Sequence, residues 1–108
     1  LCPGVLGDEK VNAAAQQRAG EIATVTSHTR PDGTSCFTVL DDFNVTDEAT
    51  GENAAWGQVT PEEVVNDWMN SEGHRANILN PDAHKMGFGY YSDNSSEWGR
   101  QWIQIFTE

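Results

Sequence analysis

The segment from Trp68 to Pro81 gathers side chains that are able to do chemistry. It reads WMNSEGHRANILNP, so a histidine, an arginine and several asparagines share a stretch that also has helical character. An imidazole such as that of His74 can transfer a proton, bind a metal through a neutral nitrogen, or simply hold a turn by hydrogen bonding. We expect Trp68 and Ile78 to form the buried face of this segment, which leaves His74 on its polar side.

Cys2 and Cys36 are the two cysteines, and both lie in turn-rich sequence rather than in an apolar run. A disulfide between them would close about 35 residues and stabilise the fold by roughly 3–4 kcal/mol on the chain-entropy estimate. We expect this bond, and with it an oxidising, extracytoplasmic environment. Two unrelated free thiols are the alternative. The sequence has no CxxC motif and no cluster of cysteine with histidine, so a structural zinc knuckle is not indicated.

The charge of the chain restricts its partners. Its net charge of −11 would repel phosphate backbones and anionic lipid, so we expect neither nucleic acid nor an anionic membrane as a partner. No apolar run approaches the roughly 20 residues that span a bilayer. The start, LCPGVLGDEK, lacks the regions of a signal peptide and is expected to belong to a mature, soluble segment. A length of 108 residues predicts one domain over residues 1–108.

Two helices have clear sequence signals. Apolar and small residues recur at steps of three and four through residues 9–25, which predicts an amphipathic helix with Asp8 as its N-cap and with Arg18 on the buried face through its stem. A second helix is expected to begin at Pro61, because Thr60 suits the N-cap and Glu63 completes a capping box. A short helical piece, HRANIL, follows it and stops before a proline.

The remaining sequence predicts a long connection and a hairpin. Residues 27–51 lose all periodicity and carry a Pro-Asp-Gly turn, which is typical of irregular structure. Residues 84–91 and 100–106 are rich in aromatic and β-branched side chains and predict two antiparallel strands. Asn53 and Asn77 are expected to satisfy backbone groups of the loops. The order of these elements predicts an α+β domain, in which helices cover a small antiparallel sheet.

Five blocks then carry a resemblance to a known family: SHTRPDGTSCFTVL, GENAAWG, WMNSEGHRANILNP, MGFGYY and QWIQIF. From about Asp8 to Phe106 the chain resembles the CAP family of cysteine-rich secretory proteins, antigen 5 and pathogenesis-related proteins, and in particular its bacterial, SCP-like branch. The resemblance implies an α-β-α sandwich and an extracellular or cell-wall-associated protein. Family domains usually begin with an additional helix, which we expect to be absent here because the chain starts at Leu1.

The resemblance also implies a cleft that carries two histidines and two glutamates in many members of the family. Matched block by block, His28 and His74 take the histidine places, and Glu52 takes the first glutamate place. Ser71 stands at the second glutamate place, and the neighbouring Glu72 would be turned away by about 100° along a helix. The expected cleft residues are therefore His28, Glu52 and His74.

Several roles are open to these three side chains. His28 and His74 could together bind zinc through one nitrogen each, which would make a weak and open site. Glu52 would have to coordinate the metal in a hydrolase, which leaves no obvious general base, or it would fix the tautomer of a histidine. A purely structural role in hydrogen bonding is the alternative for both histidines. His84 is expected to be an ordinary surface residue.

Three functions follow from the resemblance. The favoured one is a secreted, non-enzymatic binding module for a small lipid, a peptide or a cell-wall component, with zinc as the candidate cofactor. The first alternative is a metal-dependent hydrolase of peptide or cell-wall bonds, in which Glu52 would be the catalytic residue, and the second is a protein-interaction scaffold. Ser71 at the second glutamate place counts against hydrolysis, whereas the retained His28, Glu52 and His74 count against a bare scaffold.

Overall fold

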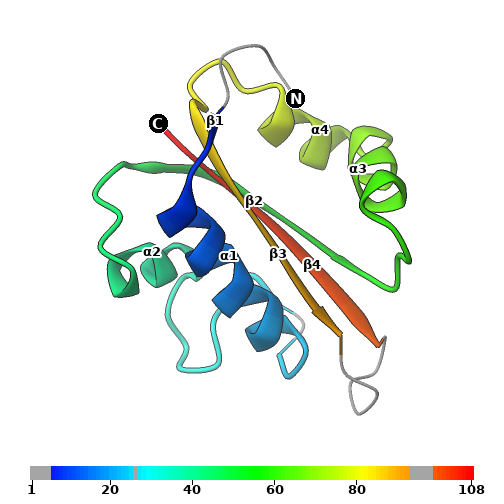
Figure 1. The fold of residues 1–108 in the computed structure, drawn as a ribbon, viewed down its shortest axis with the longest axis horizontal. Helices are drawn as coiled ribbons and strands as arrows, with labels where there is room; N and C mark the ends of the chain where they lie inside the picture. The colour runs from blue at the N-terminus through cyan, green and yellow to red at the C-terminus, as the bar shows by residue number, and fades with distance from the viewer. Residues whose placement is uncertain (1–5, 26, 93–98) are drawn as a thin grey trace.

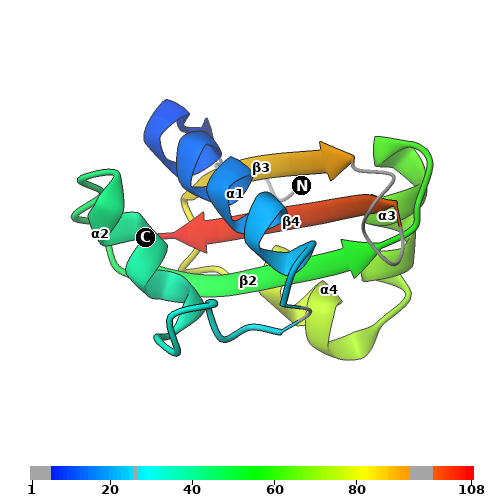
Figure 2. The ribbon, with the colours of Figure 1, turned by 90° about the horizontal axis from the view of Figure 1, so that it is seen from below.

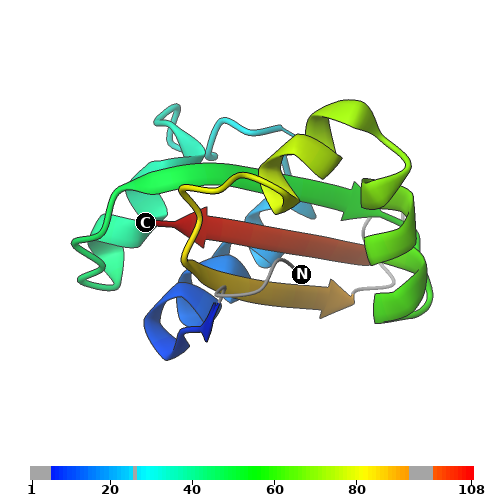
Figure 3. The same cartoon turned by 90° about the horizontal axis from the view of Figure 1, so that it is seen from above.

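A four-stranded sheet lies between two layers of helices in the computed structural model, which describes residues 6–25, 27–92 and 99–108. The elements are β1 (Leu6–Gly7), α1 (Glu9–Ile22), η1 (Cys36–Thr38), α2 (Val39–Asp42), β2 (Ala49–Trp56), α3 (Pro61–Met69), α4 (Glu72–Ile78), β3 (Lys85–Ser92) and β4 (Arg100–Thr107) (Figure 1). Helices α1 and α2 cover one face of the sheet, and α3 and α4 cover the other (Figures 2 and 3). The predicted α+β sandwich is confirmed.

The sheet is larger than the predicted hairpin, and it is mixed rather than purely antiparallel. Its order is β1-β3-β4-β2; β3 pairs with β4 as predicted, while β1 runs parallel to β3. The sequence did not predict β2, which pairs antiparallel with β4. Its sequence, ATGENAAW, has a single β-branched residue, Thr50, and therefore little strand propensity of its own. Pairing with the buried strand β4 places it in the sheet.

Helix α1 lies directly on β3 because two glycines of that strand have no side chain. A Cβ atom at Gly87 would lie 2.2 Å from the carbonyl oxygen of Val11, and one at Gly89 would lie 2.2 Å from that of Ala15. The N-cap prediction is confirmed, since the carboxylate of Asp8 accepts the N–H groups at the start of the helix. The buried face of α1 packs against β4 through Val11, Ala14, Ala15, Ala19, Ile22, Ile103 and Ile105.

Side chains of α1 also complete the hydrogen bonding along the outer edge of β3. Asn12 Oδ1 accepts the N–H of Phe88 at 3.0 Å. One turn later, Gln16 Oε1 accepts the N–H of Tyr90 at 3.1 Å, and Gln16 Nε2 donates to the carbonyl oxygen of the same residue at 2.6 Å. These two amide side chains take the place of a neighbouring strand at this part of the edge.

The start of α3 follows the prediction with one difference. Thr60 Oγ1 accepts the N–H of Glu63 at 3.1 Å, and Pro61 occupies the first helical position. The carboxylate of Glu63 accepts the N–H of Val59 at 3.3 Å, so the reciprocal bond reaches one residue further upstream than a standard capping box. The predicted site of helix initiation is confirmed.

The segment from Trp68 to Pro81 forms the end of α3 and all of α4, with a break between Met69 and Glu72. Trp68 and Ile78 are 1% and 2% exposed and belong to the second core cluster, so the predicted buried face is confirmed. Trp68 Nε1 donates to the carbonyl oxygen of Ala54 at 3.2 Å and thereby ties α3 to β2. Within the described residues, no helix has the length and apolar character needed to cross a bilayer.

Candidate functional site

A buried ion pair between Arg18 of α1 and Glu52 of β2 lies at the centre of the site. Arg18 Nε donates to Glu52 Oε2 at 2.9 Å, and Nη2 donates to Oε1 at 3.2 Å. The two side chains are 0% and 1% exposed. A guanidinium that binds a carboxylate through two hydrogen bonds is among the strongest pairings of side chains, and burial without a partner would be costly for either charge. The pair therefore holds the carboxylate of Glu52 in one orientation.

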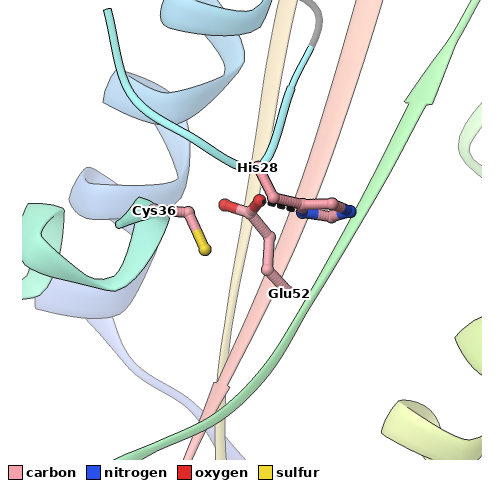
Figure 4. Close-up of side chains that lie close together, drawn as sticks. All are labelled: His28, Cys36 and Glu52. Carbon is pink, nitrogen blue, oxygen red and sulfur yellow. Dashed lines mark hydrogen bonds and ion pairs between the residues drawn. The ribbon is translucent and has the colours of Figure 1, made fainter. Parts of the chain in front are cut away.

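His28, in the loop after α1, contacts the same carboxylate from the solvent side. Its Nδ1 lies 2.7 Å from Glu52 Oε1 (Figure 4). An ionised carboxylate only accepts hydrogen bonds, so Nδ1 carries the proton, and Nε2 of the neutral imidazole then has the free lone pair. The side chain of His28 is 60% exposed, which leaves Nε2 accessible to a ligand. This contact is the one expected if Glu52 fixes the tautomer of a histidine.

Backbone pairing brings His28 close to Cys36 at the start of η1. The N–H of Cys36 donates to the carbonyl oxygen of His28 at 2.9 Å, and an isolated bridge joins Thr29 to Ser35. The connection predicted as irregular over residues 27–51 therefore contains a closed loop, followed by two short helices. Its ends present an imidazole and a thiol to the same carboxylate.

An ionic clamp fastens this loop to α1. Arg30 Nη2 lies 2.7 Å from Glu21 Oε2, and Arg30 Nη1 lies 2.9 Å from Asp42 Oδ2. Burial opposes the ionisation of Glu21, but hydrogen bonds from Arg30 and Arg18 outweigh burial and lower the pKa of this carboxyl. The clamp is joined to the central ion pair by a contact between Glu21 Oε1 and Arg18 Nη1, at 3.0 Å. The loop that carries His28 is therefore held by charge as well as by backbone pairing.

Cys36 is a free and buried thiol that faces Glu52. Burial, and after it the charge of Glu52, raises the pKa of this thiol to about 11, so it keeps its proton at neutral pH. Among the described residues Cys36 is a free thiol, so the predicted disulfide with Cys2 is not formed, and the side chain of Cys36 points towards Glu52 (Figure 4). Cys2 itself lies outside the described residues.

His74 lies on α4, and two asparagines join this helix to β2 beside Glu52. Asn53 Nδ2 donates to the carbonyl oxygen of His74 at 3.2 Å. Asn77 Nδ2 donates to the carbonyl oxygen of Glu52 at 3.3 Å and to Asn53 Oδ1 at 2.9 Å. Gly51 leaves room for this bridge, since a Cβ atom there would lie 2.7 Å from Asn77 Oδ1. Both asparagines satisfy backbone groups, as predicted, but these groups belong to α4 and β2 rather than to the long loops.

The surroundings of His74 favour its neutral form. Burial, followed by the charge of His28, lowers the pKa of His74 below its ordinary value of 6.5. The two histidines are therefore within electrostatic reach of each other, while only His28 contacts Glu52 directly. Glu72 and His84 are both exposed, the latter as predicted.

We expect the substitution His74→Gln to reduce the sensitivity of the fold to acid. Because the folded-state pKa of His74 is lowered, the unfolded chain takes up the proton first as pH falls below 6.5, and the native state loses stability from there down to the folded-state pKa. Glutamine cannot take up this proton. Urea unfolding measured between about pH 7 and about pH 5 should show a smaller decrease in the free energy of unfolding for His74→Gln than for the wild type.

The exposed His84 supplies the control for this measurement. His84→Gln should follow the acid response of the wild type, because the residue is exposed on the protein surface. If the curves of His74→Gln and the wild type were parallel over the whole range, His74 would not contribute to the pH dependence.

The sequence did not predict the roles of Arg18 and Cys36, the two side chains that contact or face Glu52 together with His28. The helical pattern places Arg18 on the buried face of α1 only through the packing of its stem. The available signal was an arginine on an otherwise apolar helix face, in a chain with 17 acidic residues that could pair with it. A fully buried arginine requires a carboxylate or several acceptors, but only the fold identifies Glu52 as the partner.

Comparisons with known proteins agree with this architecture. The model of the cysteine-rich secretory protein family, CAP, matches residues 6–106. The protein YkwD of Bacillus subtilis (strain 168) is 41% identical over 98 residues, which are 89% of this chain and 38% of YkwD. A solved extracellular protein with an SCP domain, from Bacillus anthracis, superposes with a TM-score of 0.82 at 24% identity and covers 96% of this chain and 33% of its own.

A second solved structure has the same fold in a shorter protein. An outer surface protein of Borrelia burgdorferi has a TM-score of 0.81 at 22% identity, and the match covers 96% of this chain and 77% of that one. Likeness at this level of identity shows the fold alone, and the chain spans well under half the length of YkwD. Because the family model covers nearly all of it, the chain belongs to the cysteine-rich secretory protein (CAP) family.

Proposed function

We propose that this domain is an extracellular, non-enzymatic binding module whose ligand docks beside His28 and His74. The ligand class is a small lipid, a peptide or a cell-wall component. The observation that carries the proposal is the chain of contacts from Arg18 through Glu52 to His28, which orients an exposed imidazole by means of a buried ion pair. A histidine that only filled a turn would not require a buried charge behind it.

Zinc fits the donor set of this face. His28 offers Nε2 because its other nitrogen is bonded to Glu52, and the lowered pKa of His74 keeps that imidazole in the form that binds metals. Bound there, zinc would supply a Lewis acid for an anionic or carbonyl group of the ligand. Two protein ligands make an open site, which suits reversible binding.

The position of Glu52 favours binding over hydrolysis. A general base must reach the water or the proton that it removes, whereas both oxygens of Glu52 accept hydrogen bonds from Arg18 or His28 and its side chain is 1% exposed. Glu72, the carboxylate nearest in sequence to the second glutamate place, is exposed on α4. The hydrolase alternative therefore lacks a suitably placed base among these carboxylates.

An extracellular location agrees with two solved structures of the same fold. The proteins from Bacillus anthracis and Borrelia burgdorferi that share the fold are described as extracellular and as an outer surface protein. The net charge of −11 also disfavours nucleic acid as a partner. We place the domain outside the cytoplasm, secreted or associated with the cell wall.

Calorimetric titration with zinc tests the proposal. In about 0.15 M salt, which screens scattered surface carboxylates, the wild type should bind zinc more tightly at about pH 7.5 than at about pH 5, because protons compete for the imidazole nitrogens. His74→Ala should weaken binding by about tenfold or more, since even partners of metal ligands change affinity by that factor. His84→Ala is the matched control and should bind like the wild type. Unchanged affinity in His74→Ala would remove zinc from the proposal.

A further inference from the structure

A second set of metal-binding atoms lies on the inner side of His28. Ligand atoms of His28, Cys36 and Glu52 all lie within 4.8 Å of one another. Figure 4 shows the carboxylate of Glu52 between the thiol and the imidazole, so the three side chains converge from a loop, a short helix and a strand. Cys36 and Glu52 are buried, and His28 is exposed. An imidazole, a thiol and a carboxylate are the three side-chain ligands that zinc uses in proteins.

The fold positions these three groups before any cation binds. The backbone bond from Cys36 to His28, at 2.9 Å, fixes the two loop ligands relative to each other. Arg30, through its bond to Glu21, fastens the same loop to α1, and pairing with β4 fixes Glu52. Ordering of the ligands is a large part of the free-energy cost of forming a metal site. Because the native fold already orders these three side chains, less of that cost remains when a cation binds.

The spacing of the ligand atoms requires only a small adjustment. Zinc bonds of about 2.0–2.3 Å place tetrahedral ligand atoms roughly 3.3–3.7 Å apart. His28 Nδ1 and Glu52 Oε1 lie 2.7 Å apart, and one ligand atom from each of the three residues lies within 4.8 Å of the other two. The exposed ring of His28 has room to move outward, while the other two side chains need to approach by about 1 Å or less.

We propose that His28 Nδ1, Cys36 Sγ and Glu52 Oε1 form a site for a thiophilic divalent cation such as zinc or cadmium, with water as the fourth ligand. The thiol proton passes to solvent when the sulfur binds. The thiolate and the carboxylate then balance the two charges of the cation, while Arg18 keeps its bond to Glu52 Oε2. While it is occupied, this site excludes the proposed zinc pair of His28 and His74, because a neutral imidazole has one lone pair and binding through Nδ1 leaves the ring proton on Nε2.

Cadmium titration followed by ultraviolet absorption tests this site, because a cadmium–thiolate bond gives a charge-transfer band that imidazole and carboxylate ligands do not give. The Cys2→Ser variant leaves Cys36 as the sole thiol of the chain. This variant should develop the band with a stoichiometry of one cadmium per chain. Adding Cys36→Ser should abolish the band, and adding His28→Ala should weaken affinity by about tenfold or more.

The variant Cys2→Ser/His74→Ala separates the two metal proposals. Its thiolate band should be unchanged, whereas the zinc site formed by His28 and His74 should be lost. If Cys2→Ser gave no band while thermal unfolding showed a folded protein, Cys36 would be only a hydrogen-bonding partner of Glu52 and the proposal would be wrong. A band unaffected by His28→Ala would also overturn it, since cadmium would then be bound by an isolated thiol.

Discussion

Replacing Arg18 by methionine should lower the free energy of unfolding by about 3–5 kcal/mol, the usual cost of removing one partner from a buried ion pair. Methionine fills much of the volume of the stem, so the loss is mainly electrostatic. Glu52 would remain 1% exposed with its charge uncompensated, and the carbonyl oxygen of Ser27 would lose its bond from Arg18 Nη2. Urea denaturation monitored by tryptophan fluorescence measures the change.

Two further variants separate charge from packing at this position. The double variant Arg18→Met/Glu52→Gln should recover part of the lost stability, because a neutral amide is far less costly to bury than a carboxylate. Lys10→Met, at an exposed position of the same helix, should change stability by about 0.5 kcal/mol or less. A single variant Arg18→Met with the stability of the wild type would show that the buried pair contributes nothing to the fold.

Gly89→Ala should also lower the free energy of unfolding strongly, as Arg18→Met does, but for a steric reason. The added Cβ atom would lie 2.2 Å from the carbonyl oxygen of Ala15 and 2.6 Å from the backbone nitrogen of Gln16, and backbone atoms in the middle of a helix cannot move aside individually. The helix would have to lift from the sheet. Overpacking of this kind commonly costs about 1–3 kcal/mol, and we expect at least the upper end of that range because the contact is with backbone.

Gly73→Ala is the matched control for Gly89→Ala. No atom lies within 4 Å of a Cβ built at Gly73, which is inside α4. Alanine is favoured over glycine in a helix by about 1 kcal/mol, so this variant should be as stable as the wild type or more so. Thermal unfolding of the two variants should therefore move in opposite directions. Equal stability of Gly89→Ala and the wild type would mean that α1 and β3 are not in tight contact.

Local signals predicted α1, α3, α4 and the hairpin well, because those elements are specified by residues near in sequence, whereas η1 and α2 lie in the connection that was predicted as irregular. Asp8, Thr60 and Pro61 mark helix starts through their own hydrogen-bonding capacity or ring geometry, and the aromatic runs of β3 and β4 have strong strand propensity. The strand β2 could not be found in this way. Its alanines and glycine carry little information, and it becomes a strand through pairing with residues some 50 positions away.

The candidate site was predictable in part and for a different reason. The family resemblance identified His28, Glu52 and His74, of which the structure brings His28 and Glu52 into contact. The polar neighbours of Cys36 favour a disulfide, yet the closure of the loop turns its side chain inward towards Glu52. Burial of one side chain in a loop depends on the path of the whole chain, and turn-rich composition does not reveal it.

The amide side chains of Asn12 and Gln16 along β3 have a consequence for association. An edge strand with unpaired N–H and C=O groups recruits extended segments from other chains, which leads to strand exchange or to fibrous aggregates. Here those groups of Tyr90, and the N–H of Phe88, are already occupied by the helix. A peptide ligand would therefore find the edge of β3 at Phe88 and Tyr90 already occupied, and strand addition there would require α1 to release these groups.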